Sequence, residues 1–199
     1  MIGRRLAMLL GLSVSACVPL PPAAVNSSLQ PTEALQDVKP SNVAVVPVED
    51  ATAGGNAREV LETIRQEICA ALVQRRYAPL SSRVVDPIVR EQTAGVANAS
   101  MTRPDVLARV AGHLNEDAVL AIRITMWDES RIMASARVRF AAEATMLSST
   151  KKTVLWGGTL DGEIKAGQTA AAPRYRDERV LDVAKQIARA LISQLPERS

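Results

Sequence analysis

Residues 117–127, DAVLAIRITMW, and residues 132–146, IMASARVRFAAEATM, decide the fold. In each stretch every second side chain is apolar, which is the period of a β-strand with one buried face. The buried faces predicted in this way contain Ala118, Leu120, Ile122, Ile124 and Met126, and then Ile132, Ala134, Ala136, Val138, Phe140, Ala142, Ala144 and Met146. We expect two antiparallel strands joined by a loop of three residues, 129–131, or of five, 127–131, and favour the five-residue loop because it keeps Arg123 from lying opposite Arg137.

A third strand follows in residues 152–161, after a turn at residues 149–151. This turn would pair Ala144 with Trp156, a small side chain with a large one. On the other face it would pair Arg139 with Asp161, two opposite charges. The three stretches therefore predict an antiparallel meander.

The sequence before the meander alternates short strands and helices. The expected elements are strands over residues 43–48 and 77–80 and helices over residues 56–76, 83–92 and 102–114, with a last helix opened by Asp177. The helices have apolar residues three and four positions apart. We predict one α+β domain over residues 42–196, with a mixed sheet, a C-terminal antiparallel meander and helices packed on one face.

The first sixteen residues have the three zones of an export signal. Arg4 and Arg5 precede an apolar stretch over residues 6–14, and small residues then lead to Cys17. The apolar stretch is about half the roughly 20 residues that a membrane-spanning helix needs. We therefore predict that residues 1–16 are a cleaved signal peptide.

The tetrad VSAC at residues 14–17 resembles the lipobox of bacterial lipoproteins. This resemblance implies that the Cys17 thiol receives a diacylglyceryl group, that the signal is cut before Cys17 and that the new amine is acylated, for example with palmitate. Two or more acyl chains make release from a bilayer very slow. Val18 stands where lipoproteins retained in the inner membrane of enteric bacteria often carry Asp. The expected location is therefore the inner leaflet of the outer membrane, with the domain facing the periplasm.

Residues 17–41 are predicted to be a lipidated cysteine and a proline-rich tether. The segment after Cys17 contains five prolines and no sustained period. Its roughly 24 residues would span on the order of 75 Å when fully extended and about 25–30 Å as a flexible coil.

Charge and composition exclude several classes of function. Lys and Arg number 24 and Asp and Glu 21. Without Arg4 and Arg5 the balance becomes 22 (24 − 2) against 21, and only five residues are aromatic. We therefore expect no binding of nucleic acid. One His and two Cys argue against a metal site or a disulfide framework, and no cofactor or small-molecule substrate is expected.

No catalytic residue is assigned, and the chain is predicted not to be an enzyme. His113 is expected to cap a helix end, and Cys69 to be a small buried residue, since lipidation of Cys17 removes its only disulfide partner. The alternative is a lipid-anchored hydrolase or ligand-binding protein that uses loop carboxylates. Its candidates are Glu49 and Asp50, and the cluster Asn115, Glu116 and Asp117.

The candidate binding surface is the side of the meander that points away from the predicted buried face. It would carry Arg123, Trp127, Met133, Arg137 and Arg139. Arg, Trp and Met are enriched at binding hot spots, so this face is the predicted partner-binding site. The alternative is an ordinary solvated face.

The layout resembles the small αβ domain of the curli-secretion channel subunit, of lipoprotein activators of penicillin-binding proteins and of the amino-terminal domain of the Tol-system propeller protein. It is most similar to a group of short outer-membrane lipoproteins of unknown function. The matching residues are Lys39 and Pro40, the stretch DAVL at residues 117–120 and LWG at residues 155–157. Residues 48–50, VED, depart from the pattern of that group.

Cys17, the tether and the lack of a catalytic arrangement together predict a non-enzymatic, protein-binding component of an envelope export or assembly complex. Its expected partners are the lipid bilayer, through acylated Cys17, and an envelope protein or a second copy of the chain. An activator of peptidoglycan synthesis is the nearest alternative.

Overall fold

The structure, a computed structural model, describes residues 25–95, 100–167 and 175–198 of the 199-residue chain. The predicted signal peptide and Cys17 lie outside the described residues. Within the described ranges, no helix combines the length and the apolar character needed to cross a membrane.

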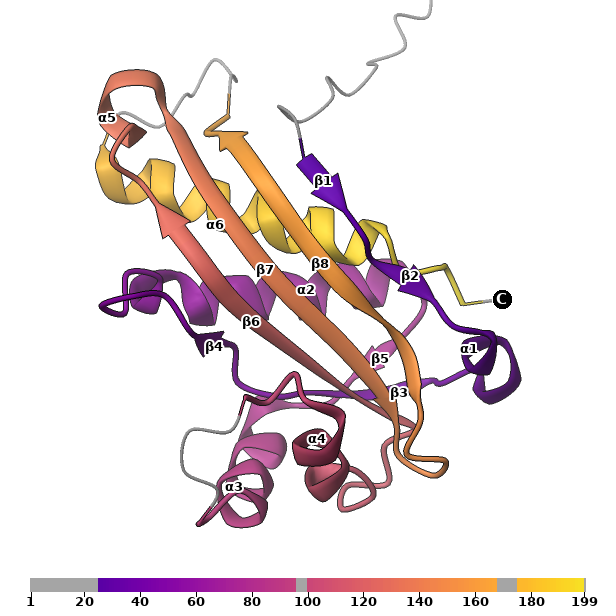
Figure 1. The fold of residues 1–199 in the computed structure, drawn as a ribbon. Coiled ribbons are helices and arrows are strands. Elements are labelled where there is room, and N and C mark those ends of the chain that lie inside the picture. Colours follow the sequence, from indigo (N-terminus) through magenta and orange to yellow (C-terminus); the bar gives the residue numbers. More distant parts are fainter. Residues whose placement is uncertain (1–24, 96–99, 168–174, 199) are drawn as a thin grey trace, which may run out of the picture.

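An eight-stranded mixed sheet forms the centre of the molecule (Figure 1). Its long antiparallel meander consists of β6 (Ala118–Asp128), β7 (Arg137–Ser148) and β8 (Val154–Lys165). On one side β6 pairs in parallel with β3 (Asn42–Val45) and β4 (Glu49–Asp50), and β3 pairs in parallel with β5 (Ala78–Pro79). On the other side β8 pairs with β1 (Val25–Ser27) and β2 (Gln30–Pro31).

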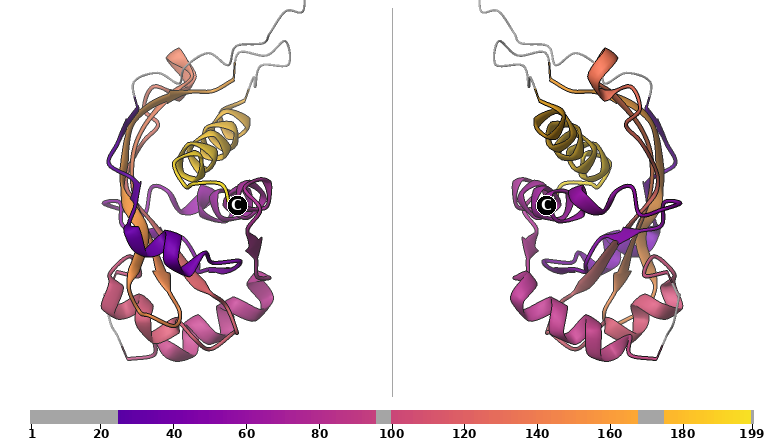
Figure 2. Two further views of the ribbon diagram at one scale, coloured as in Figure 1. Left: turned by 90° about the vertical axis from the view of Figure 1, so that its right-hand side faces the viewer. Right: turned by 90° about the vertical axis from the view of Figure 1, so that its left-hand side faces the viewer.

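Two long helices cover one face of this sheet (Figure 2). They are α2 (Leu61–Gln74), which follows the 3-10 turn η1 (Arg58–Val60), and α6 (Arg176–Ser193). Their apolar stripes meet the inward side chains of the meander in the main core, including Ile64, Ile68, Leu72, Ile187, Leu191, Phe140, Ala142, Ala144, Met146 and Trp156. The alternation predicted for residues 138–146 is confirmed here, because each of its apolar side chains is buried.

Two shorter helices build a second core on the opposite face. They are α3 (Ser82–Gln92) and α4 (Pro104–Val110), and they cover only the lower part of that face (Figure 2). Buried Arg65 of α2 links the two layers: its Nη2 donates to the carbonyl of Val45 at 2.7 Å and pairs with Asp86 of α3 at 2.5 Å. The α+β class and the mixed sheet are as predicted, but helices lie on both faces rather than on one.

The prediction of a tether over residues 17–41 is wrong from Val25 onward. Residues 25–31 form β1 and β2 along the edge of β8, and α1 (Glu33–Val38) follows. Leu29 and Leu35 are buried in the main core. The domain therefore begins no later than Val25 and not at residue 42.

The strand predicted to begin at Ile132 begins instead at Arg137. Residues 132–135 form the short helix α5 (Ile132–Ser135), and Ala136 ends it in the left-handed conformation with φ 56°. The connection between β6 and β7 is therefore longer than the predicted five residues. Arg123 lies opposite Glu143, an opposite-charge pair that the predicted register did not contain.

The predicted pairing of β7 with β8 is also shifted. Ala144 lies opposite Gly158 rather than Trp156, and Arg139 lies opposite Glu163 rather than Asp161. A bulge at Met146 and Leu147 and a five-residue turn over residues 149–153 account for the two-residue difference. Between Arg137 and Met146 the shift is even, so the side chains of this stretch keep their predicted faces.

Candidate functional site

Among the residues that the structure describes, no helix covers the upper part of the sheet on the face opposite α2 and α6 (Figure 2). We call this surface the open face. It consists of the outward side chains of β6, β7 and β8 that α3 and α4 do not cover, namely Arg123, Arg137, Arg139, Ala141, Glu143, Thr145, Thr159, Asp161 and Glu163. Most of these side chains are charged or small, so the open face is polar, and a shallow hollow lies at its lower border beside Arg123, Glu143 and Thr145.

Arg123 occupies the lower border of the open face and is already paired. Its guanidinium lies 3.3 Å from Glu49 and 3.5 Å from Glu143. Glu49 also accepts hydrogen bonds from the hydroxyl of Ser100 and the amide of Met101, both at 3.0 Å. The Arg123 network therefore holds β4, β6 and β7 to the segment before α4, and its charge is largely neutralised.

Arg137 and Arg139 lie on the open face, where the sequence predicted them. Both are exposed. Arg137 donates to Glu163 of β8 at 2.6 Å, whereas Arg139 lies between Glu163 on one neighbouring strand and Asp128 on the other. The hydrogen bonds from Ser130, together with the nearby charge of Arg139, lower the pKa of Asp128.

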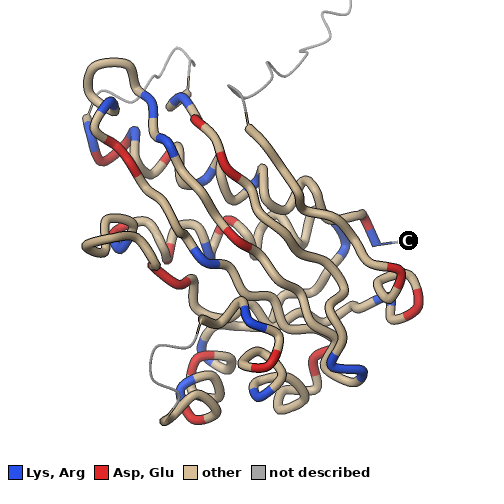
Figure 3. The backbone as a smooth tube through the Cα atoms, viewed as in Figure 1, with Lys and Arg blue, Asp and Glu red and all other residues tan. Residues whose placement is uncertain are grey.

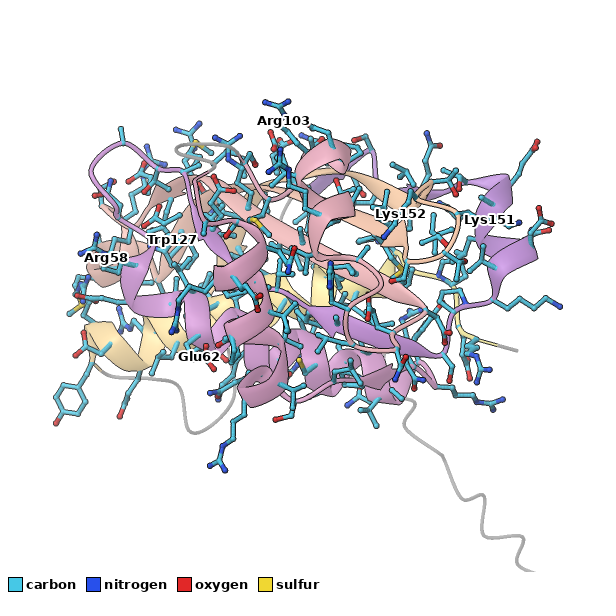
Figure 4. All side chains as sticks on the ribbon, turned by 90° about the horizontal axis from the view of Figure 1, so that it is seen from below. Arg58, Glu62, Arg103, Trp127, Lys151 and Lys152 are labelled. Atoms are coloured by element: carbon cyan, nitrogen blue, oxygen red, sulfur yellow. The ribbon has the colours of Figure 1, made fainter. Side chains whose placement is uncertain are left out.

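Trp127 is not on the open face, which corrects the prediction. The ladder between β6 and β7 shifts by one residue between Ile124 and Met126, and this bulge reverses the alternation. Trp127 is therefore turned into the main core, where it is 4% exposed, and Met126 is only partly buried. Figure 4 shows Trp127 near Arg58 at one end of the molecule, with Lys151 and Lys152 at the other end.

Met133 is also separated from the open face. It lies on α5 and is 58% exposed. The structure therefore places Arg123, Arg137 and Arg139 on one face of the sheet, with Arg123 opposite Glu143, which lies six residues along β7 from Arg137, and does not bring Trp127 or Met133 to that face. Whether the open face binds a partner stays a prediction.

The carboxylates considered for catalysis have structural partners. Asp50 accepts from the amide and hydroxyl of Thr52, at 3.0 and 2.6 Å, and from the amide of Ala57. Asp117 accepts from the amides of Ser41 and Asn42 at 2.8 and 2.9 Å. Glu49 pairs with Arg123 of β6. Arg123 lies six residues after Asp117, which is about 20 Å along an extended strand. These groups do not converge on one site.

Buried Glu116 closes the turn after α4. It accepts from the amides of Gly112 and Leu114 and, at 2.8 Å, from the hydroxyl of Ser149. It therefore joins α4 to the turn between β7 and β8. Among the residues that the structure describes, no three His, Cys, Asp or Glu side chains are placed to hold a metal ion.

The two reactive residues that the sequence singled out lie apart. His113 is exposed beyond the end of α4. Cys69 is half-buried on α2, and this burial raises the pKa of its thiol.

A polar hollow that the sequence did not indicate lies between residues 54–59, the end of β6 and the start of α6. Arg176 crosses it, forming ion pairs with Glu129, with Asp177 at 2.9 Å and with Glu59 at 3.4 Å. These carboxylates raise the pKa of Arg176. These ion pairs line the hollow and hold the start of α6 to residues 59 and 129.

Comparison with known proteins shows likeness in fold alone. No family model matches the chain, and no curated protein matches it. Among solved structures, lipoprotein GNA1162 from Neisseria meningitidis is 18% identical over 78% of this chain and 98% of its own, with a TM-score of 0.50. A subunit of the PelC dodecamer from Paraburkholderia phytofirmans is 12% identical over 88% and 99%, with a TM-score of 0.50.

The C-terminal domain of LpoB from Salmonella enterica is a weaker likeness, with 17% identity over 63% of this chain and 82% of its own and a TM-score of 0.41. The fold that the sequence resemblance implied, a small αβ domain found in lipoproteins, is thus confirmed by GNA1162 as a fold.

Proposed function

We propose that this chain is a lipid-anchored envelope protein that acts by binding protein and not by chemistry. The anchor is Cys17, acylated at the outer membrane, with the domain facing the periplasm. The likeness in fold to a protein named a lipoprotein, GNA1162, supports this proposal. So does the tetrad VSAC at residues 14–17.

The open face carries the proposed binding function. It is a rigid surface built on three paired strands. It lies on the upper part of the sheet, where no described helix covers it (Figure 2). Arg137 and Arg139 are exposed there beside Glu163 and Asp128. A surface with both charges in fixed positions selects a partner by complementarity.

The partner is an envelope protein or a second copy of this chain within an export or assembly complex. PelC, which shares the fold, is named as a dodecamer, and this supports self-association as one form of the proposal.

Crosslinking from the open face tests this function. A photoreactive residue placed at Thr159 should form defined crosslinks in cells, either to a second copy or to one envelope protein. The double change Arg137→Glu and Arg139→Glu should abolish these crosslinks. The matched control is Arg83→Glu with Arg90→Glu on α3, where both side chains are exposed.

The melting temperature should change little in either double variant, because exposed ion pairs contribute about 0–1 kcal/mol. Unchanged crosslinking in the Arg137 and Arg139 variant would reject the open face as the binding site. Mass spectrometry of the mature amino terminus tests the anchor separately, since lipidation of Cys17 adds the mass of its acyl chains.

A further inference from the structure

The first residue of the domain lies close to the proposed anchor. β1 begins at Val25, and eight Cα–Cα steps separate it from Cys17. A fully extended chain advances at most about 3.6 Å per residue, so Val25 lies within about 29 Å of Cys17. This step rests on the proposed lipidation of Cys17, and it limits which part of the domain can reach the bilayer.

Val25 lies at one end of the long meander. It pairs with Gly162 near the end of β8, and Lys165 at the end of β8 pairs with Arg137 at the start of β7. α5 lies at this same end, beside the start of α6 (Figures 1 and 2). We call it the α5 end. Because β7 has 12 residues, about 40 Å of strand separates it from the end that carries α3 and α4.

Two large apolar side chains protrude at the α5 end. Met133 of α5 is 58% exposed and Tyr175, which precedes α6, is 71% exposed. The guanidinium of Arg179 donates to the carbonyls of Ile132 and Met133 at 2.9 and 3.1 Å, which holds α5 against α6. Both protruding residues are therefore presented by a fixed backbone.

Exposed basic side chains lie at the same end of the molecule as these two residues. Arg131, Arg139 and Lys165 are exposed, and Figure 3 shows basic positions near α5 and at the adjoining ends of β7 and β8. Acidic residues also lie at this end: Glu129 and Asp177 pair with Arg176, Glu163 pairs with Arg137, and Asp177 and Glu178 are exposed shortly after Tyr175. Exposed cations around Met and Tyr match the composition of proteins that rest on a phospholipid surface.

We propose that the α5 end docks on the leaflet that holds Cys17. Met133 and Tyr175 enter the headgroup region, and Arg131 and Lys165 contact lipid phosphates. The open face then stands upright on the membrane, with α3 and α4 pointing into the periplasm. Partners would reach the open face from the side.

Fluorescent reporters on the full lipidated chain test this orientation. In a Cys69→Ala background, an environment-sensitive dye is attached at Met133→Cys or at Val84→Cys, and the protein is placed in vesicles of phosphatidylethanolamine and phosphatidylglycerol. Val84 is the matched control, since it is an exposed apolar residue, 52% exposed, on α3 at the other end. Nitroxide-labelled lipids should quench the dye at residue 133 several-fold more than the dye at residue 84.

Charge reversal gives a second, independent measurement. Arg131→Glu with Lys165→Glu should reduce the quenching at residue 133, whereas Arg83→Glu with Arg90→Glu should leave it unchanged. Equal quenching at both positions, or quenching at neither, would overturn the docking. Blue-shifted emission at residue 133 without lipid quenching would also overturn it, because it would indicate contact with protein.

The anchor is judged by a different readout. If mass spectrometry shows acylated Cys17 and residue 133 is not quenched, docking fails and the anchor stands. If Cys17 carries no lipid, the anchor fails and the distance argument for docking fails with it.

Discussion

Gly158 decides whether the amino-terminal segment belongs to the domain. Its φ is +143°, a conformation that residues with a Cβ rarely adopt. A Cβ placed there would lie 2.5 Å from the carbonyl oxygen of Ser28 and 2.9 Å from the amide nitrogen of Leu29. Both contacts are with backbone, so a side-chain rotation cannot relieve them. Gly158→Ala must therefore move residues 28 and 29 away from β8.

Two contributions raise the free energy of the Gly158→Ala protein while residues 25–31 stay docked on β8. A conformation restricted to glycine costs on the order of 1–3 kcal/mol. Forced overpacking adds about 1–3 kcal/mol. Detaching residues 25–31 exposes Leu29 to solvent. This removes about 1.5–3 kcal/mol of hydrophobic stabilisation. Detachment also breaks the backbone hydrogen bonds to β8 and returns conformational entropy to the released residues. Release of the segment is thus easier than unfolding of the main core, and we expect it to occur first.

Amide hydrogen exchange measures this release. The amides of Ser28 and Thr32 donate to the carbonyls of Thr159 and Leu155, both at 2.9 Å, and should lose their protection in Gly158→Ala. Amides of β7 should stay protected. Gly95→Ala is the matched control, because Gly95 has φ +86° but a Cβ there meets nothing within 4 Å. If Ser28 and Thr32 remain as protected as in the control, the docked amino-terminal segment is wrong.

Two further predictions concern the core. Among the described residues, the buried indole nitrogen of Trp156 has no hydrogen-bond partner, whereas that of Trp127 donates to Glu129 at 3.4 Å. An unpaired buried donor costs about 1–3 kcal/mol, and Trp156→Phe removes it. In urea titrations Trp156→Phe should therefore lower the free energy of unfolding by less than Trp127→Phe does. The reverse order would refute this account. The second prediction is that Cys69 reacts slowly with iodoacetamide at pH 8 until urea unfolds the chain, because burial raises its pKa. A thiol whose pKa is higher when folded supports folding at pH values below its unfolded pKa. That support is lost as the pH rises through the folded pKa. Above about pH 9 the free energy of unfolding of the wild type should therefore fall faster than that of Cys69→Ala. Parallel profiles of unfolding free energy against pH would contradict this.

The sequence predicted the meander because alternation is a local property. Val138, Phe140 and Met146 are buried as their spacing requires. The registers were not predictable in the same way. A bulge near Thr125 and another at Met146 each add one residue without changing the composition of the strand. Trp127 was therefore placed on the wrong face by a feature that hydrophobic period does not contain.

The amino-terminal segment was missed for a related reason. β1 and β2 contain three and two residues, too few for a period to appear, and Pro31 argues against a strand. The segment is held by backbone hydrogen bonds to the edge of β8 and by burial of Leu29 and Leu35. The hydrogen bonds join the segment to residues more than 120 positions away. Gly158 was the available signal, since glycine within a strand often marks a close backbone approach.

The corrected boundary changes which partners the chain can meet. A tether of about 24 extended residues could have carried the domain on the order of 75 Å from the bilayer. With the domain beginning by Val25, the link is at most about 29 Å, and the domain adds about 40 Å along β7. The whole reach is then about 70 Å, of which most is the rigid domain itself. On the proposed lipidation of Cys17, a partner that binds the open face must therefore come within that distance of the leaflet. This constraint favours a membrane-associated partner or a second anchored copy over a target that only a long tether could reach.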